Sequence, residues 1–384
     1  MALRVEEIGH DANYPLFTPA ASSIYVKEAQ DSELNWYNPD NQKFNHPAAL
    51  YSAGMAKLEL TRSRLVEPMI TNRDRSRTIL IADSGGYQIG SGTFQGSNAF
   101  SADIHGHGAN DIRRKILTWS ETFADYAMTL DFPAWAIDTP NYLFSKFGQC
   151  LDETFYNCSL IEKERTPGKA RFLNVIQGRS YDEALMWYNE VKVFDFEGWS
   201  FAGPVASNPE ITLKIILNMW RDGNISEDRN WIHILGRSSN AAVWCNNIFH
   251  RCIRRYICAN AQISYDSSSV VHYAINGWKV GDLRINADEM TFDKLKQQQV
   301  IRSATDYTSD VVDNLEAQLE IIRRVNELSI IDAGELRDSS CVPDFFIAFK
   351  ERVESLFRTV ADVGIENYNI NDAHLREFKG IIKS

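Results

Sequence analysis

Six short apolar runs in the sequence each end at a polar side chain or a glycine. They are TILIAD ending at Asp83, AMTLD at Asp131, FLNVIQG at Gln177 and Gly178, WSFAG at Gly203, WIHILG at Gly236 and ISYD at Asp266. Short apolar runs are typical of buried strands, and the longer amphipathic segments between them predict repeated βα units. The last four run ends are spaced roughly 30 residues apart, about one such unit each. We therefore predict an α/β fold, a TIM (β/α)8 barrel around a parallel sheet.

The polar ends of these runs predict a site. Barrel enzymes gather their reactive groups at the carboxyl ends of the strands, so Asp83, Asp131, Gln177 and Asp266 are expected around one mouth. Aspartate and glycine also follow strands simply as turn residues, and for any single run end that alternative stays open. Six such ends together favour the barrel.

The chain of 384 residues is long enough for a barrel of ~250 residues with extensions. We assign residues 1–48, which are polar and turn-rich, to an N-terminal cap, residues 49–290 to the catalytic barrel, and residues 291–384 to a helical region that completes or flanks it. Two apolar stripes at helical spacing predict helices with core or interface faces. They are Val311, Leu315, Leu319, Ile322, Val325 and Leu328, and, after Pro343, Phe345, Phe346, Phe349, Val353, Leu356, Phe357 and Val360.

Composition narrows the class of protein further. The formal net charge is −11, which is unlike a generic nucleic-acid binder, so a nucleic-acid enzyme would need its basic residues clustered at the site. The six cysteines are scattered without a C-x-x-C pair, as expected of reduced thiols in a cytoplasm. No run approaches the ~18 apolar residues of a membrane span, and the acidic N-terminus does not resemble a signal peptide.

The strongest local motif is Asp83-Ser84-Gly85-Gly86-Tyr87-Gln88. A carboxylate stands at a strand end, two glycines would allow a flat ligand close to the backbone, and Tyr87 offers a stacking face. A strand-to-loop turn with an incidental tyrosine is the alternative.

This motif is similar to the D-S-G-G-[FY]-Q signature of the tRNA-guanine transglycosylase superfamily, and further family motifs follow in the same order between about residues 79 and 270. Asp131 in TLDFP and Gln177 in NVIQG resemble the residues with which the family binds the edge of a base. Ala202-Gly203-Pro204-Val205 resembles its glycine loop less closely, and Leu235-Gly236 resembles its M-G pair. Asp266 in SYDSS stands where the family has its nucleophilic aspartate.

The resemblance implies a base-exchange reaction in which Asp266 captures C1′ of a nucleotide and Asp83 is the general acid and base. Two carboxylates suit this chemistry, because breaking a nucleoside C–N bond develops positive charge on the sugar while the base must gain a proton. The residues implied in base binding are Ser84, Tyr87, Asp131, Gln177, Gly203, Leu235 and Gly236.

The target base must leave its stack to reach such a pocket, so basic residues should line the approach. The candidates precede two of the strands: Arg73, Arg75 and Arg77 before one, and Arg251, Arg254 and Arg255 before the other. A charged loop and a solvated helix face are equally good explanations of these two clusters.

The sequence departs from the tRNA enzymes after the predicted strand that ends at Asp266. Their zinc site needs four ligands, whereas this region offers only Cys341 and His374, so we expect no structural zinc, no other metal and no cofactor. The segment YDSSSVVHY also differs from the family pattern. Both changes favour the zinc-less branch that loads 7-deazaguanines into DNA in phages and bacterial genomic islands, in the cytoplasm of a bacterial or phage-infected cell. Asn208, where the glycine loop normally ends in glutamate, favours 7-cyano-7-deazaguanine.

The expected partners are therefore DNA and a free 7-deazaguanine base, with no membrane, and the sequence leaves the oligomeric state open. A divergent tRNA-guanine transglycosylase remains the main alternative. A glycoside hydrolase would also use paired carboxylates on a barrel, although Gly85-Gly86 beside Tyr87 favours a planar base. A non-enzymatic nucleic-acid-binding barrel is the fourth possibility, and the presence of both Asp83 and Asp266 weighs against it.

Overall fold

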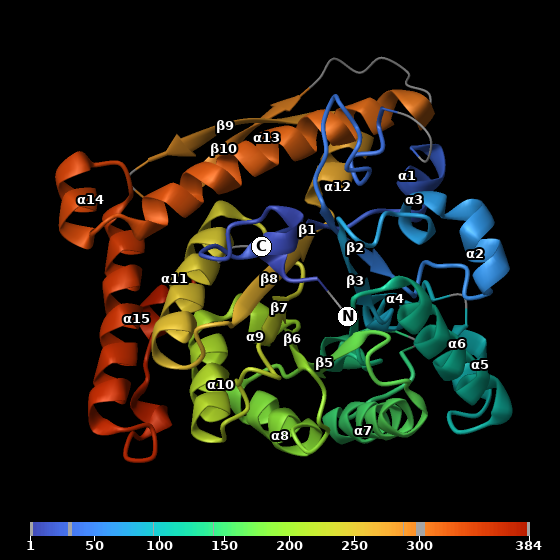
Figure 1. Ribbon diagram of the computed structural model, residues 1–384. Helices are drawn as coiled ribbons and strands as arrows, with labels where there is room; N and C mark the ends of the chain where they lie inside the picture. The colour runs from blue at the N-terminus through green and yellow to red at the C-terminus, as the bar shows by residue number, and fades with distance from the viewer. Residues whose placement is uncertain are drawn as a thin grey trace. The chain divides into compact units, whose positions relative to one another are not determined.

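The computed structural model describes residues 3–29, 33–94, 96–140, 142–286, 288–296 and 304–381. Its main sheet is eight-stranded and parallel, with the strand order β1-β8-β7-β6-β5-β4-β3-β2 (Figure 1). From β2 to β8 each strand neighbours the next one in sequence, and β1 neighbours β8. This order confirms the predicted α/β fold of the TIM-barrel class.

All six predicted strands are present. They are β3 (Ile79–Asp83), β4 (Tyr126–Met128), β5 (Arg171–Ile176), β6 (Gly198–Phe201), β7 (Trp231–Ile234) and β8 (Gln262–Ser267). Asp83 and Asp266 lie in the last two residues of their strands, and Gln177 directly follows β5. Asp131 lies three residues beyond β4, because that strand is the shortest of the six.

Two further strands of the sheet were not predicted. One lies within residues 1–48, which were assigned to the N-terminal cap, and the other begins at residue 48, the end of that assignment. β1 (Leu16–Pro19) pairs in parallel with β8, with Thr18 opposite Asp266, and β2 (Ala48–Ser52) pairs in parallel with β3. The assignment of residues 1–48 to a cap alone is therefore wrong. Leu16 and Phe17 are fully buried, which explains why this short run is a strand although prolines surround it.

The chain divides into two compact units, of which the first comprises Met1–His10 and Ala20–Gly203. It contains β2 to β6 and most of the predicted base-binding residues. Its helices are α1 (Ser23–Glu28), α2 (Leu60–Val66), α3 (Pro68–Thr71), α4 (Gly86–Gly90), α5 (Ser97–Ala102), α6 (His107–Phe123), α7 (Phe147–Glu164) and α8 (Tyr181–Val191).

The second unit comprises Asp11–Pro19 and Pro204–Ser384. It contains β1, β7 and β8. Its helices are α9 (Pro204–Ser207), α10 (Pro209–Arg221), α11 (Asn240–Tyr256), α12 (Ser269–Ile275), α13 (Ala304–Ile330), α14 (Ala333–Ser339) and α15 (Asp344–Val363).

Both helices predicted near the C-terminus are confirmed as α13 and α15. Figure 1 shows them in orange and red, and both pack against α11. The indole of Trp244 on α11 donates a hydrogen bond of 3.0 Å to the carbonyl of Phe346 on α15, and Phe249 meets Phe349 edge to face. The apolar stripes are therefore used in packing between helices, as expected.

A two-stranded antiparallel sheet crosses the predicted boundary at residue 290. It consists of β9 (Trp278–Ile285) and β10 (Met290–Lys296) and packs along α13. The expectation that the chain turns helical directly after residue 290 is therefore wrong. Apolar residues alternate with polar ones in short stretches, at 278–280 and 283–285 in β9 and at 290–292 in β10, and this period of two is that of a strand. Within the described ranges, no helix is both long and apolar enough to cross a membrane.

Candidate active site

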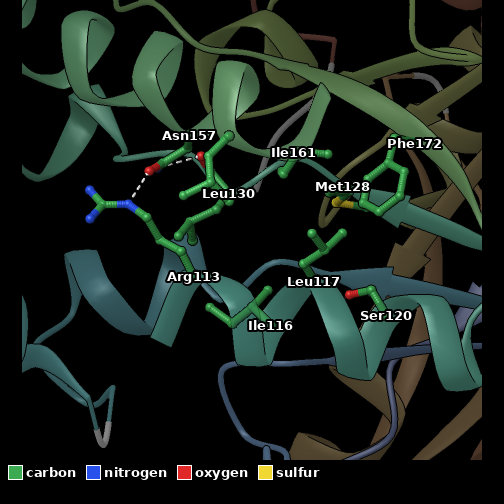
Figure 2. A pocket seen from close by; sticks show the side chains of 10 residues that line it. Arg113, Ile116, Leu117, Ser120, Met128, Leu130, Asn157, Ile161 and Phe172 are labelled. Atoms are coloured by element: carbon green, nitrogen blue, oxygen red, sulfur yellow. Dashed lines mark hydrogen bonds between the residues drawn. The ribbon is translucent and has the colours of Figure 1, made fainter. Parts of the chain in front are cut away.

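The segment that carries Asp131 is held in place by side chains of α7. Asn157 donates a hydrogen bond of 2.9 Å to the carbonyl of Leu130, and Thr154 accepts one of 3.0 Å from the amide of Phe132. Figure 2 shows the first of these contacts and the guanidinium of Arg113, which donates to Asn157 from the other side. The cavity drawn there measures about 10 Å³, which is room for at most one water, so it is a packing gap behind the site.

The carboxylate of Asp131 is buried and accepts two hydrogen bonds from predicted site residues. Gln177 donates from Nε2 to Oδ2 at 2.7 Å, and Ser84 donates from Oγ to Oδ1 at 3.2 Å. Burial raises the pKa of Asp131 to about 6; the nearby charge of Asp83 also raises it, while the hydrogen bonds from Gln177 and Ser84 lower it. The three residues thus form one polar cluster, and its predicted role in base binding stays a prediction.

Because Gly85 and Gly86 have no side chains, other parts of the protein can lie close to their backbone. The backbone of Gly85 has φ +97°, in the left-handed region that favours glycine, and a Cβ there would lie 2.8 Å from Cα of Gly54. A Cβ on Gly86 would lie 2.5 Å from Oδ1 of Asp131. Gly86 therefore makes the space in which the Asp131 carboxylate sits, a role different from the expected approach of a ligand.

Two aromatic side chains lie beside this cluster. Tyr87 is 66 % exposed, which is unusual for so large a side chain, and its ring centre lies 5.7 Å from that of Trp135 at an interplanar angle of 37°. Trp135 in turn lies next to Gly203, where an added Cβ would be 3.8 Å from the indole and 3.5 Å from Oε1 of Gln177. That Oε1 is buried and has no hydrogen-bond partner among the described residues, so its capacity as an acceptor is not used within this part of the chain.

Asp83 ends β3 and is half-buried. Its backbone carbonyl accepts a hydrogen bond of 2.8 Å from the amide of Ala53, which extends the pairing of β2 and β3 past Ser52. The charge of Asp83 reaches Asp131, because it contributes to the raised pKa of that residue. Two carboxyl groups therefore stand at the carboxyl ends of neighbouring strands in this unit.

In the second unit, Asp266 is held by two donors. Oδ1 of Asp266 accepts a hydrogen bond of 2.7 Å from the amide of Gly236 and lies 3.2 Å from Nε2 of His233. Gly236 has φ +68°, a conformation that favours glycine, and this turn after β7 points its amide at the carboxylate. Gly236 was predicted to bind a base, whereas in this arrangement its amide orients Asp266.

His233 is completely buried on β7 and is part of a chain of hydrogen bonds. The indole N–H of Trp231 donates to Oγ of Ser264 at 2.8 Å, and the same Oγ lies 2.8 Å from Nδ1 of His233. Because the indole is only a donor, the hydroxyl hydrogen of Ser264 is free to point at Nδ1. Every donor then meets an acceptor when His233 carries its proton on Nε2 and donates it to Asp266.

Sequence reasoning missed His233 and Trp135. A histidine inside the apolar run WIHIL was the available signal for the first, since a buried histidine needs polar partners. No pattern in the sequence DFPAW singles out Trp135, because its importance depends on its contact with Tyr87, which only the structure shows.

The structure thus brings the predicted residues into two groups. Ser84, Asp131, Gln177, Gly203 and Tyr87 lie together near Asp83 in the first unit, and Gly236 lies with Asp266 in the second. That both groups face one pocket stays a prediction. Leu235 follows β7 and is half-buried. Asn208 accepts a hydrogen bond of 3.1 Å from the amide of Glu210 and so caps α10.

The two arginine clusters lie at the amino ends of strands, away from the ends that carry the aspartates. Arg73 is buried and forms an ion pair with Asp125 at 2.5 Å, and Arg75 reaches the same carboxylate at 3.4 Å. Arg77 pairs with Asp40 at 2.7 Å. These contacts tie down the start of β3, and this position counts against a role for the first cluster in guiding nucleic acid toward Asp83.

The second cluster follows the same pattern. Arg251, Arg254 and Arg255 occupy the last two turns of α11, just before β8 begins, whereas Asp266 lies near the end of that strand. Arg251 donates a hydrogen bond of 2.9 Å to Ser329. The contact of these three arginines with nucleic acid near Asp266 stays a prediction. Their position before the start of β8 does not favour it.

Among the described residues, no group of three or more His, Cys, Asp or Glu side chains is arranged to hold a metal ion. Cys341 is exposed between α14 and α15, and the other five cysteines are buried as free thiols. The absence of zinc stays an expectation. No protein-family model matches the chain, and no curated protein matches it significantly.

Proposed function

We propose that this protein is a base-exchange transglycosylase that replaces guanine in DNA by a 7-deazaguanine, with 7-cyano-7-deazaguanine as the expected donor. One observation carries the proposal: a buried carboxylate, Asp131, is held by Gln177 and Ser84 beside the exposed ring of Tyr87. The order of the motifs in the sequence supports it.

The Asp131 cluster matches the edge of a guanine. Guanine and 7-deazaguanine present adjacent N–H donors on one edge, and the carboxylate of Asp131 retains lone pairs for them. Oε1 of Gln177 is a second acceptor without a partner among the described residues. A planar base bound there would have the ring of Tyr87 to stack on. A sugar hydrolase site would have no need for this combination.

The proposed chemistry uses the two strand-end aspartates in two balanced steps. The Asp266 carboxylate bonds to C1′ while the C1′–N9 bond breaks, and the electron pair leaves with guanine, which takes a proton from Asp83. The incoming 7-deazaguanine then gives its ring N–H proton to Asp83 and bonds to C1′, which releases Asp266. His233 and the Gly236 amide act as positioning groups that orient the attacking oxygen. The proposal requires Asp83 and Asp266 to face the same nucleotide.

The test is to incubate the full chain with radiolabelled guanine or 7-cyano-7-deazaguanine and either duplex DNA or tRNA. We expect label in DNA and none in tRNA. The reason is that the sequence has neither the zinc ligands of the tRNA enzymes nor the segment that these enzymes share after the nucleophilic aspartate. The Asp131→Asn variant should incorporate much less label. Label in tRNA alone would instead establish the divergent tRNA enzyme, and label in neither would leave base exchange without support.

A pH dependence follows from the raised pKa of Asp131. As the pH falls through about 6, this carboxyl takes up a proton and one of its oxygens ceases to be an acceptor. We therefore expect kcat/KM for the incoming base to fall about tenfold per pH unit below pH 6, since kcat/KM reports groups of the free enzyme. Stopped assays with labelled base between pH 4.5 and 8 measure this limb.

In the Asp131→Asn variant this limb should disappear, because the amide does not titrate in that range. Ser84→Ala is the matched comparison, since it removes one of the hydrogen bonds that lower the pKa and should shift the limb toward higher pH. An unchanged limb in both variants would assign the pH dependence to another group.

A further inference from the structure

The second unit contains a cavity outside the candidate active site. It has a volume of about 560 Å³ and lies among the end of α11, the middle of α15 and the residues before β1. This volume is typical of sites for small molecules. Its charged lining residues are Arg251, Arg254, Arg255, Arg358 and Glu354.

The lining is strongly positive. It holds four guanidinium groups and one carboxylate, in a chain whose formal net charge is −11. The carboxylate of Glu354 is already engaged, because it lies 2.9 Å from Nζ of Lys350 and 3.5 Å from Arg251. Arg255 and Arg358 are exposed and form no ion pair within the described part of the chain. Positive charges that converge on a cavity without compensation are what an anionic ligand would neutralise.

The back wall of the cavity is held in place by hydrogen bonds and ring contacts. Arg251 is tied to Ser329 at 2.9 Å, and Arg254 donates a hydrogen bond of 3.2 Å to the carbonyl of Ala261. Tyr256 stacks on Phe357 with ring centres 6.2 Å apart and forms an aromatic wall next to Arg255. A ligand would therefore meet a back wall that is already ordered, and mainly Arg255 and Arg358 would have to be ordered on binding.

The position separates this cavity from Asp266. Tyr14 precedes β1, its carbonyl accepts a hydrogen bond of 3.1 Å from Gln262, and Gln262 is the first residue of β8. The cavity is thus at the amino ends of β1 and β8, whereas Asp266 is four residues further along β8, about 13 Å at the rise of a strand. A nucleotide bound at Asp266 would not occupy it.

We propose that this cavity binds a diphosphate ester of nucleotide size, as a second site separate from the one at which bases are exchanged. Guanidinium groups match phosphoryl oxygens in pairs of parallel hydrogen bonds, and the excess positive charge of the lining suits a diphosphate better than a single carboxylate. The volume leaves room for a ring beside the wall of Tyr256. This inference does not rest on the proposed function.

The experiment is isothermal titration calorimetry of the full chain with ADP as the probe, followed by displacement with pyrophosphate. We expect binding that weakens with added salt and that pyrophosphate competes away. The Arg255→Gln and Arg358→Gln variants should each weaken ADP binding about tenfold, because each loses a charge-assisted contact. Both side chains are exposed, so the fold should be kept, and circular dichroism checks this.

The matched control is Arg352→Gln, an exposed arginine on the same helix as Arg358 but outside the cavity lining. Its affinity for ADP should equal that of the unmodified protein. Absence of ADP binding would overturn the proposal, and so would affinity that is equal in all three variants. A short DNA duplex that binds in place of ADP, and whose binding alone is lost in the Arg255→Gln and Arg358→Gln variants, would make the cavity a nucleic-acid contact instead.

Discussion

The Asp266→Asn variant is expected to form no covalent complex with DNA and to show no detectable exchange of labelled base. The substitution removes the nucleophilic oxygen charge but keeps the size of the side chain. The amide oxygen of the new side chain still accepts from Gly236 and His233, so the local structure should be preserved. The measurement is a denaturing gel of enzyme mixed with end-labelled duplex DNA, where a covalent adduct migrates with the protein.

The control for this experiment is Asp228→Asn, an exposed aspartate of the same unit, which should form the adduct at the normal rate. A persisting adduct in Asp266→Asn, combined with its loss in Asp83→Asn, would mean that the nucleophile and the acid have been exchanged in our assignment. Normal exchange in both variants would remove the basis of the proposed mechanism.

The Asp83→Asn variant should slow exchange by roughly 10²–10⁴-fold while it still binds the free base, since that is the usual contribution of a general acid. An asparagine cannot give a proton to the departing guanine. DNA that contains 7-methylguanine provides a sharp comparison, because this cationic base leaves as a neutral molecule without gaining a proton. Single-turnover formation of the adduct on both DNAs measures the effect.

We expect Asp83→Asn to form the adduct slowly on guanine and close to the normal rate on 7-methylguanine. The matched control is Asp182→Asn, an exposed aspartate in the first turn of α8. Equal slowing on both DNAs would show that Asp83 positions the nucleotide and does not supply a proton.

Much of the fold was predictable because buried parallel strands leave a clear mark in sequence. β3 and β8 are continuous apolar runs that end in aspartate, and each was located to within a residue or two. β1 was not predicted, because a four-residue strand that follows Pro15 and ends at Pro19 carries too little periodicity to be distinguished from a turn. Its burial comes from pairing with β8, more than 240 residues away in the chain, with Thr18 donating to the carbonyl of Tyr265.

The candidate site was predictable in its residues but less so in their roles. Asp131 and Gln177 were expected to lie together, and they share a hydrogen bond. The role of Gly86 was not predictable, because it depends on how closely the Asp131 carboxylate approaches a backbone 45 residues away. His233 was missed for the same reason, since only the strand register of β7 and β8 brings it beside Asp266.

The groups that hold Asp266 have a consequence for how its charge would be used. One donor is a backbone amide, and the other is Nε2 of an imidazole whose Nδ1 lies 2.8 Å from the hydroxyl of Ser264. A lysine or arginine in place of His233 would instead bring a permanent positive charge against the carboxylate. In the proposed mechanism, the groups that orient Asp266 would thus bring no permanent positive charge to it, and its carboxylate would be the group that meets the cation formed when the glycosidic bond opens.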